Sequence, residues 1–488
     1  MSETSARVTR SSALILAAMV TGGTISLLIS VSVARFVGVE DFGIYSILVS
    51  MQNMIGILAG LEMRSAIAKY ISEHHQEDKE AASEIARIGL EITLVFSTAC
   101  AIIYLSLAQI IAEEFYQVRL MVALIPISAV VVMTSSIYAA STGIAQGYQK
   151  MRLIALVQIL TPTICLVGVV TLASTLSLKG VLLAYVIAQT VASAIILTRI
   201  RRTSLQRTRS RDSNRTLIRK MLGFAVPAVI AAALVVPVFW IGNTVLVLTS
   251  DFEAMGHFAV AIVVFNSVQM IPQSIVVPLM PRISESVAKS RARVSSMVER
   301  SARGMSVLLF PLIFAGALFS QELVKLAFGG RYAESADAVY LVLIAVYLFA
   351  QAAMIGAMIV GTGRMWMGLG LNAIWAAAFL SLVFVLVPPM GIVGLGAAFV
   401  GSYAVHLMTS CFVSARYFQV VLSKVYLKTL VATGFLITGC FVVGWHMPSD
   451  WIVRGVLLVV ASLVMIWRES DLISEVSLQM RSLRDAIL

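Results

Sequence analysis

Charged residues are scarce in this chain. Asp, Glu, Lys and Arg make up 12% of its 488 residues, whereas hydrophobic residues make up 59%. A water-soluble domain carries about 25% charged residues, and the mean hydropathy here is +0.94. Because water cannot be the solvent for most of such a chain, the composition predicts an all-α integral membrane protein with no soluble domain of its own.

Cysteine is also scarce, and its pattern excludes two kinds of site. The four cysteines, Cys100, Cys165, Cys411 and Cys440, stand singly inside apolar runs. Such spacing fits neither a disulfide framework nor a metal site, so we interpret them as packing residues. His257 and His406 are isolated within or beside apolar runs and are interpreted in the same way. We therefore expect no metal and no cofactor.

Two features of enzymes are missing as well. There is no Gly-x-x-x-x-Gly-Lys-Ser/Thr phosphate loop, so the chain cannot itself use ATP in the usual way. The segments predicted to lie outside the membrane are short, the longest being about 321–336. A glycan polymerase or ligase would need a substantial outside loop with catalytic charges. We therefore expect that the protein is not an enzyme.

Long apolar runs fill the remaining sequence. A spanning helix needs about 20 apolar residues, because the hydrocarbon core is about 30 Å thick and a helix rises 1.5 Å per residue. Fourteen segments qualify or nearly so: 13–33, 42–62, 86–107, 119–141, 153–173, 180–198, 222–248, 258–281, 304–320, 337–359, 368–388, 392–415, 429–446 and 451–467. The first is too long for a signal peptide. The last two are short, and a re-entrant or interfacial hairpin after twelve spans is the alternative.

The basic residues predict the orientation. All but six of the 36 Lys and Arg residues fall on the inner side if the N-terminus is cytoplasmic. The six are Arg35, Arg119, Lys179, Lys325, Arg331 and Arg454. By the positive-inside rule both termini are cytoplasmic. The densest basic run, 199–220, joins the sixth and seventh spans. There we interpret it as a topogenic linker attracted to anionic lipid, not as a nucleic-acid patch.

The chain also repeats itself at an offset of 213 or 214 residues. The matching pairs are Gly43 with Gly256, Asn53 with Asn266, Lys69 with Arg282, the loop 146–150 with 360–364, and Gly180 with Gly394. The common offset predicts two pseudo-symmetric six-helix lobes, 1–215 and 216–415, followed by two C-terminal helices and a cytoplasmic tail within 416–488. A scaffold protein would need no such repeat.

Each predicted lobe holds an even number of spans, so both enter the membrane in the same direction. Transporters with parallel repeats bind substrate between the lobes and alternate access by rocking one against the other. We therefore expect a transporter.

Polar side chains on the spans are the candidate substrate contacts, because such side chains are costly in a membrane and usually face a cavity or another helix. Asn266, Gln269 and Gln273 share one face of span eight. Gln52 and Asn53 lie on span two. We predict that these residues line a hydrated central lumen. The alternative is interhelical hydrogen bonding between closely packed helices.

Charged side chains near the spans give two further candidates. Arg64, Lys69 and Arg282, at the predicted inner ends of spans two and eight, are suited to a phosphate or diphosphate head group. Their alternative role is ordinary snorkelling and anchoring. Glu91 is a carboxylate expected to be buried inside span three. It either pairs with Arg87 one turn earlier or takes part in ion coupling.

Three segments carry a resemblance to a known family. They are 34–45 (ARFVGVEDFGIY), 60–71 (GLEMRSAIAKYI) and 326–332 (LAFGGRY). With fourteen spans in 6 + 6 + 2 order, the chain resembles the polysaccharide (oligosaccharide) flippases of the multidrug/oligosaccharidyl-lipid/polysaccharide exporter superfamily.

The resemblance implies movement of a polyprenyl-diphosphate-linked oligosaccharide across the cytoplasmic (inner) membrane. The implied partners are this lipid-linked substrate, membrane lipids, and a glycan polymerase or glycosyltransferases of the same pathway, but no nucleic acid. Relatives that flip the peptidoglycan precursor carry arginines in their first helix, and 13–33 has none. The runner-up is a cation-coupled multidrug and toxin exporter, which usually has an acid in its first or seventh span. Neither 13–33 nor 222–248 contains one.

Overall fold

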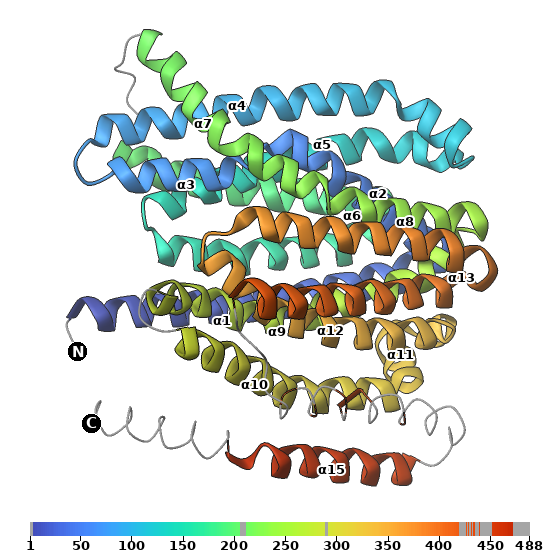
Figure 1. The fold of residues 1–488 in the computed structure, drawn as a ribbon. Helices are drawn as coiled ribbons and strands as arrows, with labels where there is room; N and C mark the ends of the chain where they lie inside the picture. Colours follow the sequence, from blue (N-terminus) through green and yellow to red (C-terminus); the bar gives the residue numbers. More distant parts are fainter. Residues whose placement is uncertain are drawn as a thin grey trace. The chain divides into compact units, whose positions relative to one another are not determined.

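The computed structural model describes residues 3–204, 211–287, 291–418 and 451–471, together with positions 426, 428, 431, 433, 434 and 439. Every regular element in this part of the chain is helical (Figure 1). In chain order the elements are α1 (Glu3–Val37), α2 (Val39–Gly60), α3 (Met63–His74), α4 (Lys79–Ser106), the π-helical η1 (Ile110–Phe115), α5 (Arg119–Gly147), α6 (Met151–Ser204), α7 (Arg211–Ala233), α8 (Val236–Thr249), α9 (Phe252–Val287), α10 (Arg291–Leu318), α11 (Ser320–Phe328), the 3₁₀ turn η2 (Gly330–Tyr332), α12 (Ser335–Gly361), α13 (Met365–Phe418) and α15 (Trp451–Arg468).

The chain divides into two compact units, Met1–Gly256 and His257–Leu488. In the first, α5 packs against α2, α3, α4 and α6, and α7 packs against α3. In the second, α12 packs against α10 and α13. The first unit thus includes α7 and α8, which the sequence repeat assigns to the second lobe. The lobe boundary after residue 215 stays a prediction about the repeat.

Two sharp turns explain why α6 and α13 are each 54 residues long. A helix of that length measures about 80 Å, far more than a bilayer. The backbone breaks at Ser177 (φ 48°, ψ −131°) and at Gly391 (φ 52°, ψ −126°). Contacts across each break are antiparallel: a Cβ added to Gly180 would lie 2.2 Å from the carbonyl oxygen of Leu172, and one added to Gly394 would lie 2.2 Å from that of Leu386. Each element is therefore a hairpin of two helices.

The two hairpin turns stand at the offset of the sequence repeat. Ser177 and Gly391 stand 214 residues apart and share one backbone conformation. A second matched pair is Gln149 (φ 54°) and Gly363 (φ 74°), in the loops that the sequence aligns. The backbone N–H of the residue that follows each of them donates the same kind of hydrogen bond. Lys150 N–H donates to the carbonyl of Ala145 at 2.9 Å, and Arg364 N–H donates to that of Ile359 at 3.2 Å.

Within the described residues, ten helical stretches are long and apolar enough to cross a membrane. They cover the first twelve predicted spans, because α6 and α13 each contain two. The predicted span 429–446 lies outside the described residues except for a few single positions, and so do Cys440 and residues 205–210 of the basic run. The predicted span 451–467 coincides with α15. This establishes a multi-pass membrane protein.

α15 runs antiparallel to α10 within the second unit. Near the end of α10, Arg454 pairs with Glu322 of α11 at 2.9 Å. Near the other end of α15, Arg303 of α10 pairs with Glu469 at 2.6 Å. The two ion pairs fix the register of α15 along α10.

Candidate functional site

The predicted second span, 42–62, coincides with α2, and a separate shorter helix, α3, follows it. Leu61 and Glu62 both adopt left-handed backbone conformations (φ 46° and 49°) and separate α2 from α3. α3 then packs closely on α5. A Cβ added to Gly143 would lie 2.5 Å from the backbone oxygen of Arg64, and one added to Gly147 would lie 2.6 Å from the Cβ of Ile71. Two small residues four apart allow such a close approach of helices, and they fix the position of α3.

α3 carries Lys69 to the side of α7. The Lys69 ammonium lies 4.5 Å from the ring centroid of Phe224 on α7 and 5.2 Å from that of Tyr70. The Tyr70 hydroxyl donates a hydrogen bond of 3.2 Å to the carbonyl of Lys220. Cation–π contacts at exposed sites contribute about 0.5–1 kcal/mol each, so Lys69 is held against α7 without being neutralised.

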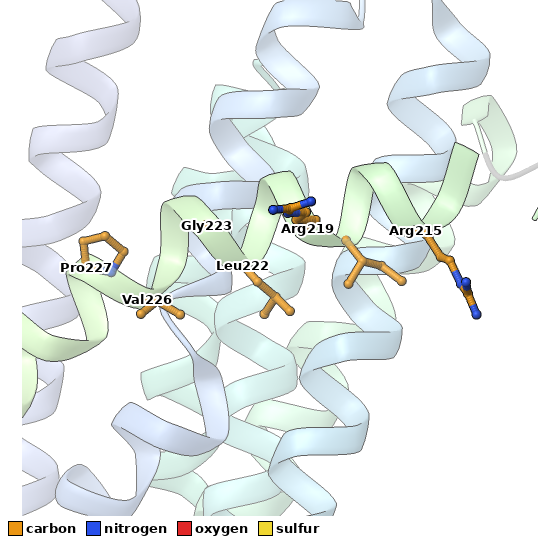
Figure 2. A pocket seen from close by; sticks show the side chains of 7 residues that line it. Arg215, Arg219, Leu222, Gly223, Val226 and Pro227 are labelled. Atoms are coloured by element: carbon orange, nitrogen blue, oxygen red, sulfur yellow. The ribbon is translucent and has the colours of Figure 1, made fainter. Parts of the chain in front are cut away.

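Four exposed cations lie on α3 and on the first turns of α7, where Figure 2 shows Arg215 and Arg219. We call them the basic cluster: Lys69, Arg215, Arg219 and Lys220. Within the described part of the chain, no member forms an ion pair with a carboxylate. The cluster therefore has charge to offer to an external anion, and its arginines are suited to phosphate oxygens.

The other two predicted cations are placed differently. Arg64 is exposed at the start of α3, five residues before Lys69 and so on a different side of the helix. Arg282 lies on α9, but its side chain is outside the described residues. The structure therefore places Lys69 against Phe224 of α7, whereas Arg64 lies on a different side of α3.

The two amides of α2, Gln52 and Asn53, differ in whether they bond another helix or are exposed. Gln52 Nε2 donates to Ser128 Oγ of α5 at 2.9 Å, and the Tyr104 hydroxyl of α4 lies 3.4 Å from the same oxygen. This is the interhelical hydrogen bond that the alternative interpretation requires. Asn53 is exposed. A lumen contact by Asn53 is therefore the stronger of the two predictions.

The amides of α9 lie on the less buried side of that helix. Asn266 and Gln273 are exposed and Gln269 is partly exposed, whereas Phe265 is buried against Phe399 and Tyr403 of α13. The polar face predicted from the sequence is thus a real feature of α9. Its role as a lumen wall stays a prediction.

Glu91 is paired, as the first of its two interpretations required. Arg87 Nη1 lies 2.6 Å from Glu91 Oε1, and the same guanidinium forms a second ion pair with Glu84. The expectation that Glu91 is buried is wrong, because its side chain is 57% exposed. Of the two carboxylates that pair with Arg87, Glu84, which the sequence reasoning missed, is the buried one. It lies just before the predicted third span, and a charged residue in that position is not unusual in a membrane protein.

One hydrogen-bond network ties α8 to the segment after α4. The Trp240 indole donates to the Tyr116 hydroxyl at 3.1 Å, and that hydroxyl lies 2.8 Å from Thr244 Oγ1. Burial raises the pKa of Tyr116, against the smaller opposing effect of these hydrogen bonds. The hydroxyl therefore stays protonated at neutral pH and links η1 to α8.

Comparison with known proteins now adds to this geometry. The profile of the family described as polysaccharide biosynthesis protein matches residues 8–287, more than half of the chain. The chain belongs to this family. No curated protein matches this chain in sequence.

Several solved structures share the fold of this chain. The lipid II flippase MurJ, in an inward closed conformation, superposes with a TM-score of 0.75 at 12% identity, over 94% of this chain and 99% of that one. An inward-facing MATE family multidrug resistance transporter of the MOP superfamily gives 0.71 at 13% identity, over 85% and 95%. A MOP superfamily transporter from Pyrococcus furiosus gives 0.60 at 14%, over 88% and 96%. The fold is therefore that of the MOP superfamily.

Sequence reasoning missed the contact between α3 and α7. The sequence assigns Arg215, Arg219 and Lys220 to a topogenic linker, because their charge alone explains orientation. The basic run ends at Lys220, directly before the apolar segment that begins at 222. Only the packing of α3 on α7 shows that Lys69 contacts Phe224 and that Tyr70 bonds the carbonyl of Lys220.

Proposed function

We propose that this chain is a flippase that carries a polyprenyl-diphosphate-linked oligosaccharide from the inner to the outer leaflet of the cytoplasmic membrane. The observation that carries the proposal is its membership of the polysaccharide biosynthesis protein family. A fold shared over nearly the whole chain with a lipid II flippase supports it. The basic cluster offers an anion site without a described counter-charge, as a diphosphate head group requires.

The proposed mechanism assigns different surfaces to the parts of the substrate. The diphosphate binds cations at the cytoplasmic ends of the helices, with Lys69 as a contact and Arg64 and Arg282 as further candidates. The sugar contacts a hydrated lumen whose walls carry Asn53 and the amides of α9. The lipid tail stays in the apolar phase. The lobes then alternate access by rocking, as parallel-repeat transporters do.

Several finer properties belong to the same proposal. We propose fourteen spans with both termini cytoplasmic, on the strength of the basic-residue distribution. The antiparallel packing of α15 along α10 supports α15 as a complete span. We also propose that the protein performs no covalent chemistry and that its partners are the glycosyltransferases or polymerase of the same pathway.

The second candidate is a cation-coupled drug exporter, favoured by the likeness of the fold to MATE transporters. The sequence opposes it, since the spans 13–33 and 222–248 contain no Asp or Glu. Both candidates are transporters, so the test must separate their substrates.

The deciding experiment measures where the lipid-linked glycan resides. In a strain depleted of this protein, the glycan should accumulate on the cytoplasmic leaflet and disappear from the cell surface. Re-expression should reverse both effects. Normal surface glycan without such accumulation, combined with increased sensitivity to cationic drugs, would replace the flippase by the exporter.

A second experiment addresses the head-group contact. Lys69→Gln should reduce the complemented surface glycan at least about five-fold at unchanged protein level, because one charge-assisted hydrogen bond contributes about 1.5–3 kcal/mol. The matched control is Lys150→Gln, an exposed lysine in the loop after α5. Equal transport by the two variants would remove Lys69 from the site.

A further inference from the structure

His257 lies near the start of α9 and is buried, with 4% of its surface exposed. Its Nδ1 lies 3.3 Å from the hydroxyl oxygen of Ser335, the first residue of α12. Its Nε2 lies 3.6 Å from Oε2 of Glu334, the residue before α12. The sequence interprets this histidine as a packing residue, but the structure places each of its ring nitrogens near a polar group of one segment.

That segment directly follows 326–332, the third of the stretches that resemble the flippase family. The ring of Tyr332 packs edge-on against the imidazole of His257, with 6.2 Å between centroids, and Phe328 packs on Tyr332 at 6.1 Å. Tyr332 and Ser335 are fully buried, whereas the side chain of Glu334 between them is 80% exposed. The imidazole is therefore enclosed, while its carboxylate partner is open to the surroundings.

This arrangement suits a histidine that changes its charge. The hydroxyl of Ser335 can donate or accept, so it satisfies Nδ1 whether or not that nitrogen carries a proton. The 3.6 Å between Nε2 and Glu334 exceeds an ordinary hydrogen bond but is within ion-pair distance. A neutral imidazole gains little at that distance, whereas an imidazolium is attracted. A buried charge is costly unless it is paired, and Glu334 supplies the counter-charge.

Other ionisable groups surround this pair. Burial raises the pKa of the Tyr332 hydroxyl, against the smaller lowering effect of Arg331, so the hydroxyl stays protonated at neutral pH. The part of α13 that packs on Phe258, around Phe399, carries no charge. Charged residues on the neighbouring stretches are Asp251 and Glu253 on α9, Lys325 on α11, Arg331 in η2, Asp337 on α12, and Glu40 and Asp41 on α2, which follow the Val39 carbonyl that Gly256 approaches. A test must therefore separate Glu334 from these charges.

We propose that His257 is a proton-binding site that is reached from the outside through Glu334, and that the bound proton fastens the start of α9 to the start of α12. The outer location rests on the predicted orientation, in which both helices begin on the outer face. α9 also carries Asn266, Gln269 and Gln273, the amides proposed to contact the sugar. The ligand is a proton, and histidine is the side chain that takes one up between pH 5 and 8.

The first test follows the charge of His257 by NMR in the full-length purified protein in detergent. The chain has five histidines, so isotope-labelled histidine gives few enough signals to titrate separately. The signal that is missing from His257→Gln identifies the residue. In the wild type this signal should titrate between pH 5 and 8. Glu334→Gln should move the midpoint at least about 0.5 pH unit lower, because a nearby opposite charge favours the charged form.

Glu253→Gln is the matched control. It removes an exposed carboxylate that stands four residues before His257 on the same helix. It should move the midpoint less than Glu334→Gln does. Equal shifts would mean that His257 senses only the general field of this helix end, and no titration between pH 5 and 8 would mean that it is a neutral packing residue. Either result would overturn the proposal.

A second test measures the fastening through thermal stability. If the proton fastens the two helices, the native state binds it more tightly than the unfolded chain does, so the added stability is present at low pH and lost as the pH rises. Glu334→Gln should therefore lower the melting temperature at about pH 5.5 but not at about pH 8. In a His257→Gln background it should have no effect at either pH. An equal effect with and without His257 would contradict the fastening.

These outcomes are separate from those of the proposed function, because neither measurement depends on transport. Both can succeed if the depletion experiment shows no flipping, and both can fail if it does. One consequence rests on the proposed function. The rate at which glycan appears on the cell surface should depend on external pH in the wild type, and His257→Gln should remove that dependence at unchanged protein level.

Discussion

Arg454 on α15 and Glu322 on α11 form an ion pair, although they stand 132 residues apart in sequence. Arg454 Nη2 lies 2.9 Å from Glu322 Oε1, and Nη1 donates a 2.6 Å hydrogen bond to the carbonyl of Leu318. The arginine is 2% exposed. A cation that would otherwise be costly in the bilayer is thus satisfied by the end of the helix on which α15 packs.

This pair predicts an unequal effect of its two members on stability. Glu322→Gln should lower the melting temperature of the detergent-solubilised protein more than Arg454→Leu does. Glu322→Gln removes the counter-charge of the buried Arg454 cation, whereas Arg454→Leu removes that cation and leaves Glu322, whose side chain is 51% exposed. A buried charge that has lost its counter-charge costs about 3–5 kcal/mol. Lys325→Leu, on the exposed surface of α11, serves as the control, and a similar melting temperature for all three variants would contradict the prediction.

The register of α15 along α10 predicts which faces of the membrane its ends reach. In a cysteine-free background, Lys325→Cys, close to Glu322, should react with an impermeant maleimide added to the outside of sealed cells. Ser470→Cys, next to Glu469, should react only after permeabilisation. If α15 were part of an interfacial hairpin, both cysteines would react from the same side.

The contact between α3 and α5 predicts that Gly143 tolerates no side chain. Gly143→Ala should destabilise the protein by about 1–3 kcal/mol, as overpacking does, because its Cβ would lie 2.5 Å from the oxygen of Arg64. A displaced α3 should also reduce transport, because α3 carries Lys69. Gly56→Ala is the control, since a Cβ there meets no atom within 4 Å. Equal melting temperatures of the two variants would show that α3 moves away from the added methyl group at no cost in stability.

The hairpin turn in α13 predicts a backbone effect at Gly391. Its φ of 52° with ψ of −126° is unfavourable for a residue with a Cβ, and such strain costs about 1–3 kcal/mol. Gly391→Ala should therefore lower the melting temperature, whereas Gly370→Ala, within a regular helix, should raise it or leave it unchanged. A reversed order would mean that the turn relaxes at no cost.

The two carboxylates bound by Arg87 should differ in importance. Glu84→Gln should reduce stability more than Glu91→Gln, because Glu84 is buried and Glu91 is largely exposed. If Glu91 only pairs with Arg87, transport by Glu91→Gln should keep the pH dependence of the wild type. A changed pH profile with unchanged protein level would revive the ion-coupling role of Glu91.

The contacts of single polar residues could not be predicted from the sequence. Gln52 and Asn53 are adjacent amides with the same sequence signal, yet Gln52 bonds Ser128 and Asn53 is exposed. Helical periodicity places both on α2, but it cannot say which one meets a neighbouring helix, since the neighbour comes from 76 residues further along the chain. For the same reason, the sequence could not show that Glu84 is buried or that Lys69 contacts α7.

The sequence by itself determined the class of protein, the apolar stretches long enough to cross a membrane, and the family. Each follows from patterns that are local: apolar runs long enough for a bilayer, and motifs in order. Only the tertiary structure decided that Lys69 lies against Phe224 of α7 and that Arg454 pairs with Glu322. Those relationships depend on which helix faces which, and helix packing in a bilayer is set by the fit of side chains that are distant in sequence.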